Sequence, residues 1–165
     1  MTGPERAQTL VTRLARSGFG SPREAATELE NLGLVDDGVI TALAAAADAD
    51  LAATGLARLV EEARDRVALV DRLRTDETFR RRLSSVLGAS AALGAHLARH
   101  PDDWHVLDDG LTASSRPSRL GLQATLRDAV RGRTGADARD ALRRAYRRLL
   151  LVLAARDLAG GLAVD

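Results

Sequence analysis

Leucine, alanine and valine recur along this chain every three to four residues, and a residue that starts helices precedes most of these runs. Ala7, Leu10 and Leu14 are spaced as one face of a helix with 3.6 residues per turn, and Gly18 follows as a stop. Apolar residues make up 45% of the chain but aromatic residues only 2%. Because sheets are enriched in aromatic and β-branched residues, this balance favours helices. The sequence predicts an all-α protein without a sheet.

Start and stop signals divide the chain into about seven to eight helices, which we expect to form an irregular multi-helix bundle. The strongest start is Ser21 followed by Pro22, because Ser21 can cap free amides and Pro22 suits the first helical position. Glu24 completes a capping box, and Gly33 ends this helix.

Aspartates mark the next helix starts. Asp36 or Asp37 precedes an alanine-rich helix that extends to residue 47, and Asp48 or Asp50 precedes another. The apolar positions of that second helix continue to residue 60 and then to residues 67 and 70, so its boundary near Asp65 stays open.

The central part of the chain predicts a helix starting at residues 75–78, with a break or change of direction at Gly88. Pro101 ends the continuation of this helix. Asp102 and Asp103 favour a short helical turn that holds Trp104 and Leu107.

Residues 111–118 are the most loop-like segment, and a helix that ends at Gly132 follows them. The last helix covers roughly residues 136–158, where Asp140 is placed to pair with Arg144. Its residues 149–155, beginning at Leu149, are apolar on every side. Such a helix must be enclosed, and we infer that part of its partner surface lies outside this chain. Residues 160–165 are interpreted as a connector or a cut end.

Length and charge narrow the class of protein. The 165 residues suit one domain, 1–165, with a possible subdivision into 1–74 and 75–165. A net charge of +1, with both signs interspersed, argues against nucleic-acid binding. The absence of cysteine, of a signal peptide and of a long apolar run predicts a cytoplasmic protein with no membrane partner.

The histidines raise the question of a metal site. His96, His100 and His105 lie within ten positions, and the first two are one helical turn apart, as in many metal-binding pairs. A third ligand of fixed geometry is missing, because His105 lies beyond Pro101. We favour the alternative that His96 is a partly buried packing residue and that the other two are surface or capping groups.

Two further patterns resemble nucleotide-binding motifs. Asp48 and Asp50 are spaced like paired magnesium ligands, but such a pair works on a strand, so helix capping is the better explanation. Residues 18–21 are a glycine-containing segment without a preceding strand, and we interpret it as a turn, not as a phosphate loop.

Basic clusters are the remaining candidates. One stripe lies on the last helix, at Arg143, Arg144, Arg147 and Arg148, and a smaller cluster occupies residues 80–82. Solvated faces are the favoured interpretation, and docking of an acidic partner is the alternative. No Ser, His and Asp arrangement suggests a nucleophile with its base. The sequence predicts no catalytic, cofactor-binding or metal-binding residue in this chain.

Several segments, in this order, resemble one family. The clearest is residues 82–104, RLSSVLGASAALGAHLARHPDDW, and the second is residues 145–159, AYRRLLLVLAARDLA. Weaker matches are residues 12–22 and 47–61. Together these segments are similar to the bifunctional glutamine synthetase adenylyltransferase and adenylyl-removing enzyme of high-GC bacteria.

The resemblance implies the N-terminal helical region of a longer enzyme, in front of two nucleotidyltransferase domains. In the family, the first of these domains removes AMP from a tyrosine of glutamine synthetase by phosphorolysis, and the second attaches AMP using ATP and magnesium. The family's catalytic signature, including its Ser-Asp-x-Asp pair, is absent from this chain. The resemblance therefore implies no Mg²⁺, ATP or phosphate ligand here.

The implied role of the chain is structural and regulatory, and we expect it to be inactive alone. The resemblance implies glutamine synthetase and a PII-type signal protein as partners, with the missing catalytic domain packed on residues 149–155. The alternative is a free-standing helical protein-interaction adaptor without enzymatic activity.

Overall fold

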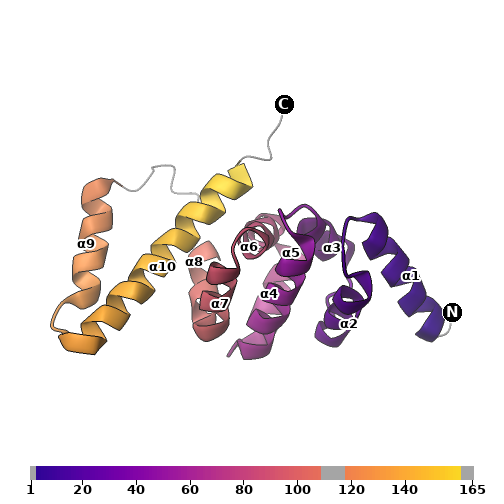
Figure 1. Cartoon of the computed structure of the whole chain (residues 1–165), viewed down its shortest axis with the longest axis horizontal. Helices are drawn as coiled ribbons and strands as arrows, with labels where there is room; N and C mark the ends of the chain where they lie inside the picture. The colour runs from indigo at the N-terminus through magenta and orange to yellow at the C-terminus, as the bar shows by residue number, and fades with distance from the viewer. Residues whose placement is uncertain (1–2, 109–117, 161–165) are drawn as a thin grey trace.

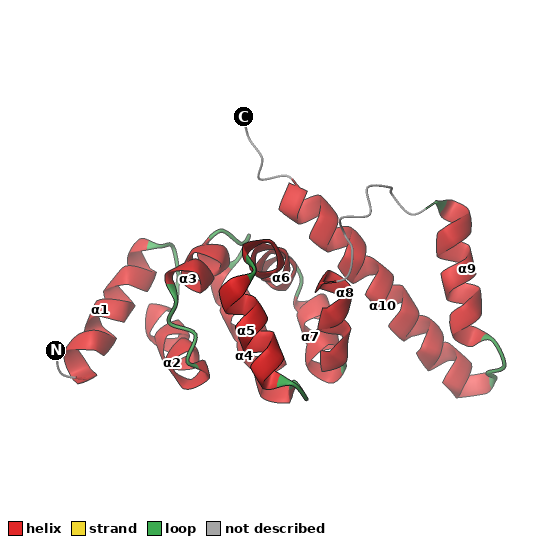
Figure 2. Ribbon diagram, turned by 180° about the vertical axis from the view of Figure 1, so that it is seen from behind, coloured by secondary structure: helices red, strands yellow, loops and turns green. Residues whose placement is uncertain are grey.

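The computed structural model describes residues 3–108 and 118–160, and nearly all of them are helical (Figure 1). Ten α-helices and one short 3-10 helix form in these ranges, which contain no strand (Figure 2). The all-α prediction is therefore confirmed. The predicted number of helices is too low, mainly because the helix expected to run past Asp65 is divided in two.

The helices are α1 (Gly3–Arg16), α2 (Pro22–Leu32), α3 (Asp37–Ala44), α4 (Ala49–Glu62), α5 (Arg66–Thr75), α6 (Glu77–Ala89), α7 (Ala91–Arg99), η1 (Pro101–Trp104), α8 (His105–Asp108), α9 (Arg119–Val130) and α10 (Gly135–Gly160). The predicted loop 111–118 falls outside the described residues except for Ser118, which precedes α9. The expected connector falls outside them after residue 160.

Polar side chains begin several of these helices, as helix-capping chemistry requires. In each case the side-chain oxygen accepts a hydrogen bond from the amide three residues further along. These residues are Asp48, Asp65, Asp76, Ser90 and Ser118. Asp65 thus begins α5, which settles the boundary that the sequence left open.

The start of α2 differs from the prediction. Ser21 precedes Pro22, but its side chain makes no capping hydrogen bond. Asp50 of α4 instead holds the turn before α2: its Oδ2 accepts from the Gly20 amide at 2.8 Å and its Oδ1 from the Ser21 amide at 3.1 Å. The predicted capping box is wrong, because the Ser21 amide that Glu24 would need is already bonded to Asp50.

The break predicted at Gly88 occurs two residues later, at Ser90. α6 continues through Gly88 to Ala89, and Ser90 begins α7. A Cβ atom at Gly88 would lie 2.6 Å from the Ala46 Cβ and 2.7 Å from the Asp48 carbonyl oxygen. The glycine therefore allows α6 to pack very closely against the turn between α3 and α4.

The helices form an elongated row, with α1 at one end and α9 at the other (Figure 1). α4 and α6 pack against each other at its centre, where α4 also contacts α2 and α7, and α6 also contacts α3 and α10. The buried hydrophobic side chains form one cluster, from Leu10 in α1 to Ala155 in α10. Helices on both sides of residue 75 share this cluster, and the subdivision at that residue stays a prediction.

The segment after Pro101 forms the predicted short helical turn. Trp104 is buried with its ring centroid 5.4 Å from that of Phe79, in an edge-on arrangement, and Leu107 is fully buried. The indole also stacks on His105 at 3.7 Å between centroids. These contacts fix η1 against the core and so determine where its two aspartates lie.

The apolar segment of α10 is covered on one side. Leu151 and Ala155 are fully buried in the core. Leu149, Val152 and Leu153 are only half-buried, and they lie outside the core cluster. The enclosure on every side that the sequence predicts is therefore not provided by the described part of this chain.

Candidate functional site

The end of α7 places two histidines on one helix face. His96 and His100 are one turn apart, and their ring centroids are 4.9 Å apart. His96 is buried, and its Nε2 lies 2.9 Å from Oδ2 of Asp103. Because an ionised carboxylate only accepts hydrogen bonds, the histidine donates through Nε2. His96 is therefore buried, as predicted, and it also fixes the position of the Asp103 carboxylate.

Asp103 is the centre of this site, although no sequence pattern marks it as a functional residue. Its side chain is 2% exposed, and it lies in η1, which Pro101 starts directly after α7. Arg144 of α10 donates through Nη2 at 2.9 Å and through Nε at 3.4 Å, and Arg148 lies 3.7 Å away. An Asp after a helix-ending proline is normally an exposed cap, and this obscured its role.

The predicted pair of Asp140 with Arg144 is wrong. Asp140 instead accepts a hydrogen bond from Arg143 at 3.2 Å, one residue closer along the helix. Arg144 turns toward the body of the molecule because the carboxylate of Asp103 accepts two of its donors. A bidentate pair with a buried carboxylate is stronger than an exposed pair along a helix.

The ionisation of this cluster follows from its contacts. Burial by itself raises the pKa of Asp103, but hydrogen bonds from His96 and Arg144, together with the charges of Arg144 and Arg148, outweigh it. The result is a pKa lowered from 3.8 to about 2. The hydrogen bond to Asp103 also raises the pKa of Arg144. Burial first, and then the charges of His96 and Arg144, lower the pKa of His100.

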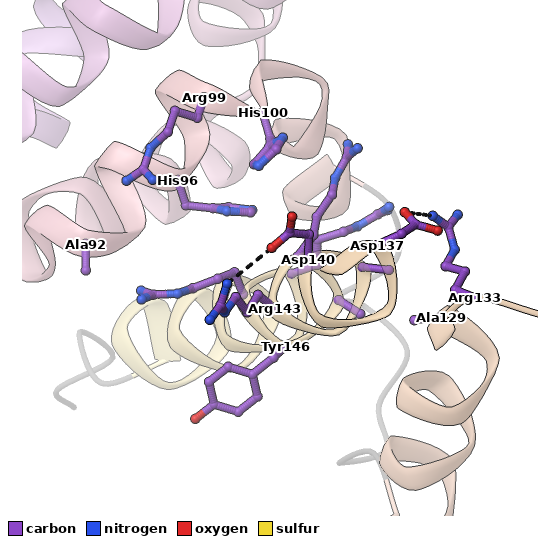
Figure 3. Close-up of a pocket in the computed structure, with 15 residues that line it drawn as sticks. Ala92, His96, Arg99, His100, Ala129, Arg133, Asp137, Asp140, Arg143 and Tyr146 are labelled. Atoms are coloured by element: carbon purple, nitrogen blue, oxygen red, sulfur yellow. Dashed lines mark hydrogen bonds and ion pairs between the residues drawn. The ribbon is translucent and has the colours of Figure 1, made fainter. Parts of the chain in front are cut away.

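A cavity of about 970 Å³ adjoins this cluster, between α7, the end of α9 and the N-terminal half of α10. His96 and His100 point into it from α7, and Asp140 and Arg143 face them from α10 (Figure 3). All four arginines of the predicted basic stripe line this cavity. The stripe therefore lines one wall of a concave site, and Arg143, Arg144 and Arg148 stay exposed to solvent as expected.

The three histidines are the candidate metal ligands of this chain. Within residues 3–108 and 118–160, no group of three or more His, Asp and Glu side chains is arranged to hold a metal ion. His105 stacks on Trp104, with 3.7 Å between the ring centroids. Within the same ranges, no helix is both long and apolar enough to cross a membrane.

The two nucleotide-like motifs have structural roles. Asp48 caps α4, and Asp50 binds the amides of Gly20 and Ser21 in the turn between α1 and α2. The amides that a phosphate loop would offer to a ligand are therefore bonded to the chain's own carboxylate. Helix capping, the favoured explanation of both aspartates, is confirmed for Asp48, whereas Asp50 holds the turn before α2.

The smaller basic cluster is partly structural. Arg80 donates through Nη1 to the carbonyl oxygens of Leu73 at 2.8 Å and Arg74 at 3.2 Å. It thereby binds carbonyl groups at the C-terminal end of α5, where positive charge is favourable. The prediction that this chain contains no catalytic, cofactor-binding or metal-binding residue stays a prediction.

Comparison with known proteins gives one consistent result. The chain is 44% identical over 97% of its length to the bifunctional glutamine synthetase adenylyltransferase/adenylyl-removing enzyme of Streptomyces avermitilis, of which it covers 16%. Proteins of the same name from Streptomyces coelicolor and Mycolicibacterium smegmatis are 42% and 40% identical over 98% and 88% of the chain. The chain covers 16% and 15% of these two proteins.

No protein-family model matches the chain, and no solved structure matches it. The similarity to the three bacterial proteins nevertheless extends over nearly all of the residues that carry the resemblance described above. The chain is therefore a relative of the bifunctional glutamine synthetase adenylyltransferase/adenylyl-removing enzymes and matches about 16% of their length.

Proposed function

We propose that this chain is the N-terminal helical scaffold of a cytoplasmic enzyme that adenylylates and deadenylylates glutamine synthetase. In this proposal the Mg²⁺, ATP and phosphate chemistry belongs to the remainder of the enzyme, which the matched relatives contain beyond the 16% covered here. Glutamine synthetase is the proposed substrate, and a PII-type signal protein is the proposed regulator. The helices position the catalytic domain and contribute no reacting group.

The observation that carries this proposal is the incompletely covered apolar face of α10. Leu149, Val152 and Leu153 are spaced as one helical face, and they are half-buried outside the core. Apolar residues at this spacing normally face a packed partner. We propose that the partner is the catalytic domain that follows in the same enzyme.

A docking experiment tests this face. The chain is mixed with the remainder of the Streptomyces avermitilis relative, purified without the part that this chain matches, and binding is measured by analytical ultracentrifugation. We expect a complex with the unchanged chain and at least about tenfold weaker binding with Leu153→Glu, because a buried charge without a partner is costly. Leu120→Glu is the matched control, since Leu120 is 77% exposed on α9. Equal binding by all three chains, or by none, would contradict the proposed docking.

We also expect the chain to be inactive alone. The described residues contain no cluster of three metal ligands that could serve nucleotidyl transfer. The assay incubates AMP-modified glutamine synthetase with the purified chain, phosphate and magnesium, and measures released ADP. Sustained turnover above a blank without the chain would overturn the scaffold role.

The second candidate is a free-standing helical adaptor without enzymatic activity. The same face of α10 supports it, because an adaptor also needs an apolar docking surface. The two candidates differ in their partner: an adaptor would leave the remainder of the enzyme unbound in the ultracentrifuge.

A further inference from the structure

The cavity between α7 and α10 has a strongly positive wall that the proposed scaffold role does not use. Six arginines line it: Arg99, Arg133, Arg143, Arg144, Arg147 and Arg148. Only two carboxylates, Asp137 and Asp140, line it with them. The whole chain has a net charge of +1, so the lining of this cavity is more positive than the chain as a whole.

Half of these arginines already have a close carboxylate partner. Arg133 lies 3.0 Å from Asp137, Arg143 lies 3.2 Å from Asp140, and Arg144 lies 2.9 Å from Asp103. Among the described residues, the other three arginines that line the cavity have no carboxylate this close to balance their charge.

The remaining three are Arg99, Arg147 and Arg148. Arg99 donates its Nε to the Ala95 carbonyl, which leaves its terminal nitrogens available. Arg148 comes only to 3.7 Å of Asp103, a carboxylate that Arg144 already binds with two donors. Within the described ranges, neither Arg99 nor Arg147 has a carboxylate within ion-pair distance.

The behaviour of His100 agrees with a positive potential inside the cavity. Burial is the main cause of its lowered pKa, and the charges of His96, Arg144 and Arg99 lower it further, while Asp103 acts in the opposite direction. Burial disfavours a charge of either sign, but the arginine charges that lower this pKa would favour an anion in the same space.

We propose that this cavity binds a small phosphorylated ligand, with Arg99, Arg147 and Arg148 holding its phosphate oxygens. Guanidinium groups bind phosphate with paired donors, and a phosphoryl group offers three acceptor oxygens and nearly two negative charges. A single carboxylate would balance only one of the three arginines. The cavity volume of about 970 Å³ leaves room for more than one phosphate group.

Titration calorimetry with the full 165-residue chain tests this proposal, using pyrophosphate and ATP as probes at low salt. We expect both to bind, and we expect Arg147→Gln or Arg99→Gln to weaken binding at least about tenfold, as for loss of a charged hydrogen bond. Arg139→Gln is the matched control: Arg139 is exposed on α10 outside the cavity, and the substitution removes the same charge. We expect this control to change affinity less than about twofold.

A second measurement locates the ligand. The pKa of His100, followed by NMR of its ring, should rise when pyrophosphate saturates the chain, because the bound anion offsets the nearby arginines. Tighter binding of ATP than of pyrophosphate would identify a nucleotide as the ligand, and equal binding would assign recognition to the phosphates alone.

Several results would overturn the proposal. Absence of pyrophosphate binding, an equal loss in Arg139→Gln and Arg147→Gln, or an unchanged His100 titration would each do so. Citrate that binds as tightly as pyrophosphate would show a site for anions in general. None of these outcomes affects the docking of the catalytic domain, which depends on a different face of α10.

Discussion

A single buried carboxylate connects three helical elements of this protein. Asp103 in η1 accepts hydrogen bonds from His96 in α7 and from Arg144 in α10, which is 41 residues away along the chain. A buried charge is tolerated only when partners satisfy it, and here the partners come from separate helices. The residue therefore links α10 to α7 beside the cavity, in addition to the packing of α10 on α6.

Protonation of Asp103 at low pH should remove the stability that its ionised carboxylate contributes. Folding lowers the pKa of Asp103 from 3.8 to about 2, so its ionised form stabilises the fold above about pH 4, and this contribution is lost as the pH falls toward about 2. The shift corresponds to about 2 kcal/mol. In urea denaturation between pH 7 and pH 2, we expect the free energy of unfolding to fall more steeply for the unchanged chain than for Asp103→Asn.

The same series provides its control. At pH 7 we expect Asp103→Asn to cost about 2 kcal/mol, because Arg144 and His96 lose the charge that they face. Asp128→Asn removes an exposed pair with Arg131 and should cost less than about 1 kcal/mol. Parallel pH profiles for Asp103→Asn and the unchanged chain would show that Asp103 does not cause the loss of stability in acid.

At the scale of elements, close helix packing depends on the small side chains of α4 and α6. Leu87 of α6 would lie 3.1 Å from a Cβ atom at Gly55 in α4, and Gly88 lies directly against Ala46 and Asp48. Glycine lowers the intrinsic stability of a helix, so its presence inside α6 is explained by the neighbour that it admits.

Gly88→Ala should therefore destabilise the protein although alanine favours helices. The added methyl would meet Ala46 and a backbone carbonyl at distances that force α6 to shift, and we expect a net cost of about 1–2 kcal/mol in thermal unfolding. Gly121→Ala in α9 is the matched change, since its Cβ would meet only the Ser118 Oγ at 3.4 Å. That substitution should be neutral or stabilising by up to about 1 kcal/mol. An unchanged melting temperature for Gly88→Ala would show that the contact relaxes freely.

The whole molecule is an elongated row of helices whose packing weakens toward the α9 end. None of the described side chains of α9 is buried, and its main contacts are with α10 (Figure 1). In contrast, α4 is a helix of similar length with a fully packed face of buried alanines and leucines. Local stability follows the density of buried contacts.

Amide hydrogen exchange should therefore rank the helices. We expect the amides of α9 to exchange at least about tenfold faster than those of α4, because α9 can detach from α10 without opening the core. Mass spectrometry of peptic peptides measures both helices in one experiment. Equal protection of α9 and α4 would show that the row unfolds as one cooperative unit.

Local signals in the sequence predicted much of this fold. Gly18, Gly33 and Gly132 all have positive φ angles at the helix ends where the sequence places them. Asp48 and Asp76 cap the helices that they precede. These features depend on residues three or four positions apart, so a single segment contains all the information that they require.

Other assignments failed because a distant residue competed for the same group. Asp50 takes the Ser21 amide from 29 residues away, and Asp103 takes Arg144 from Asp140. In both cases the local partner was chemically suitable but was not the one selected. A carboxylate that is already positioned by packing loses less conformational entropy on binding than a mobile neighbour along the helix.

The sequence by itself determined that this protein is helical, where most of its helices begin and end, and which family it resembles. Only the tertiary structure decided that Asp103 is buried between His96 and Arg144, that Gly88 is a packing contact, and that the arginines of α10 line a cavity. The physical reason is the separation of the interacting residues along the chain. Helix propensity and capping act within about one turn, whereas buried ion pairs and cavities require side chains that the fold brings together from distant parts of the chain.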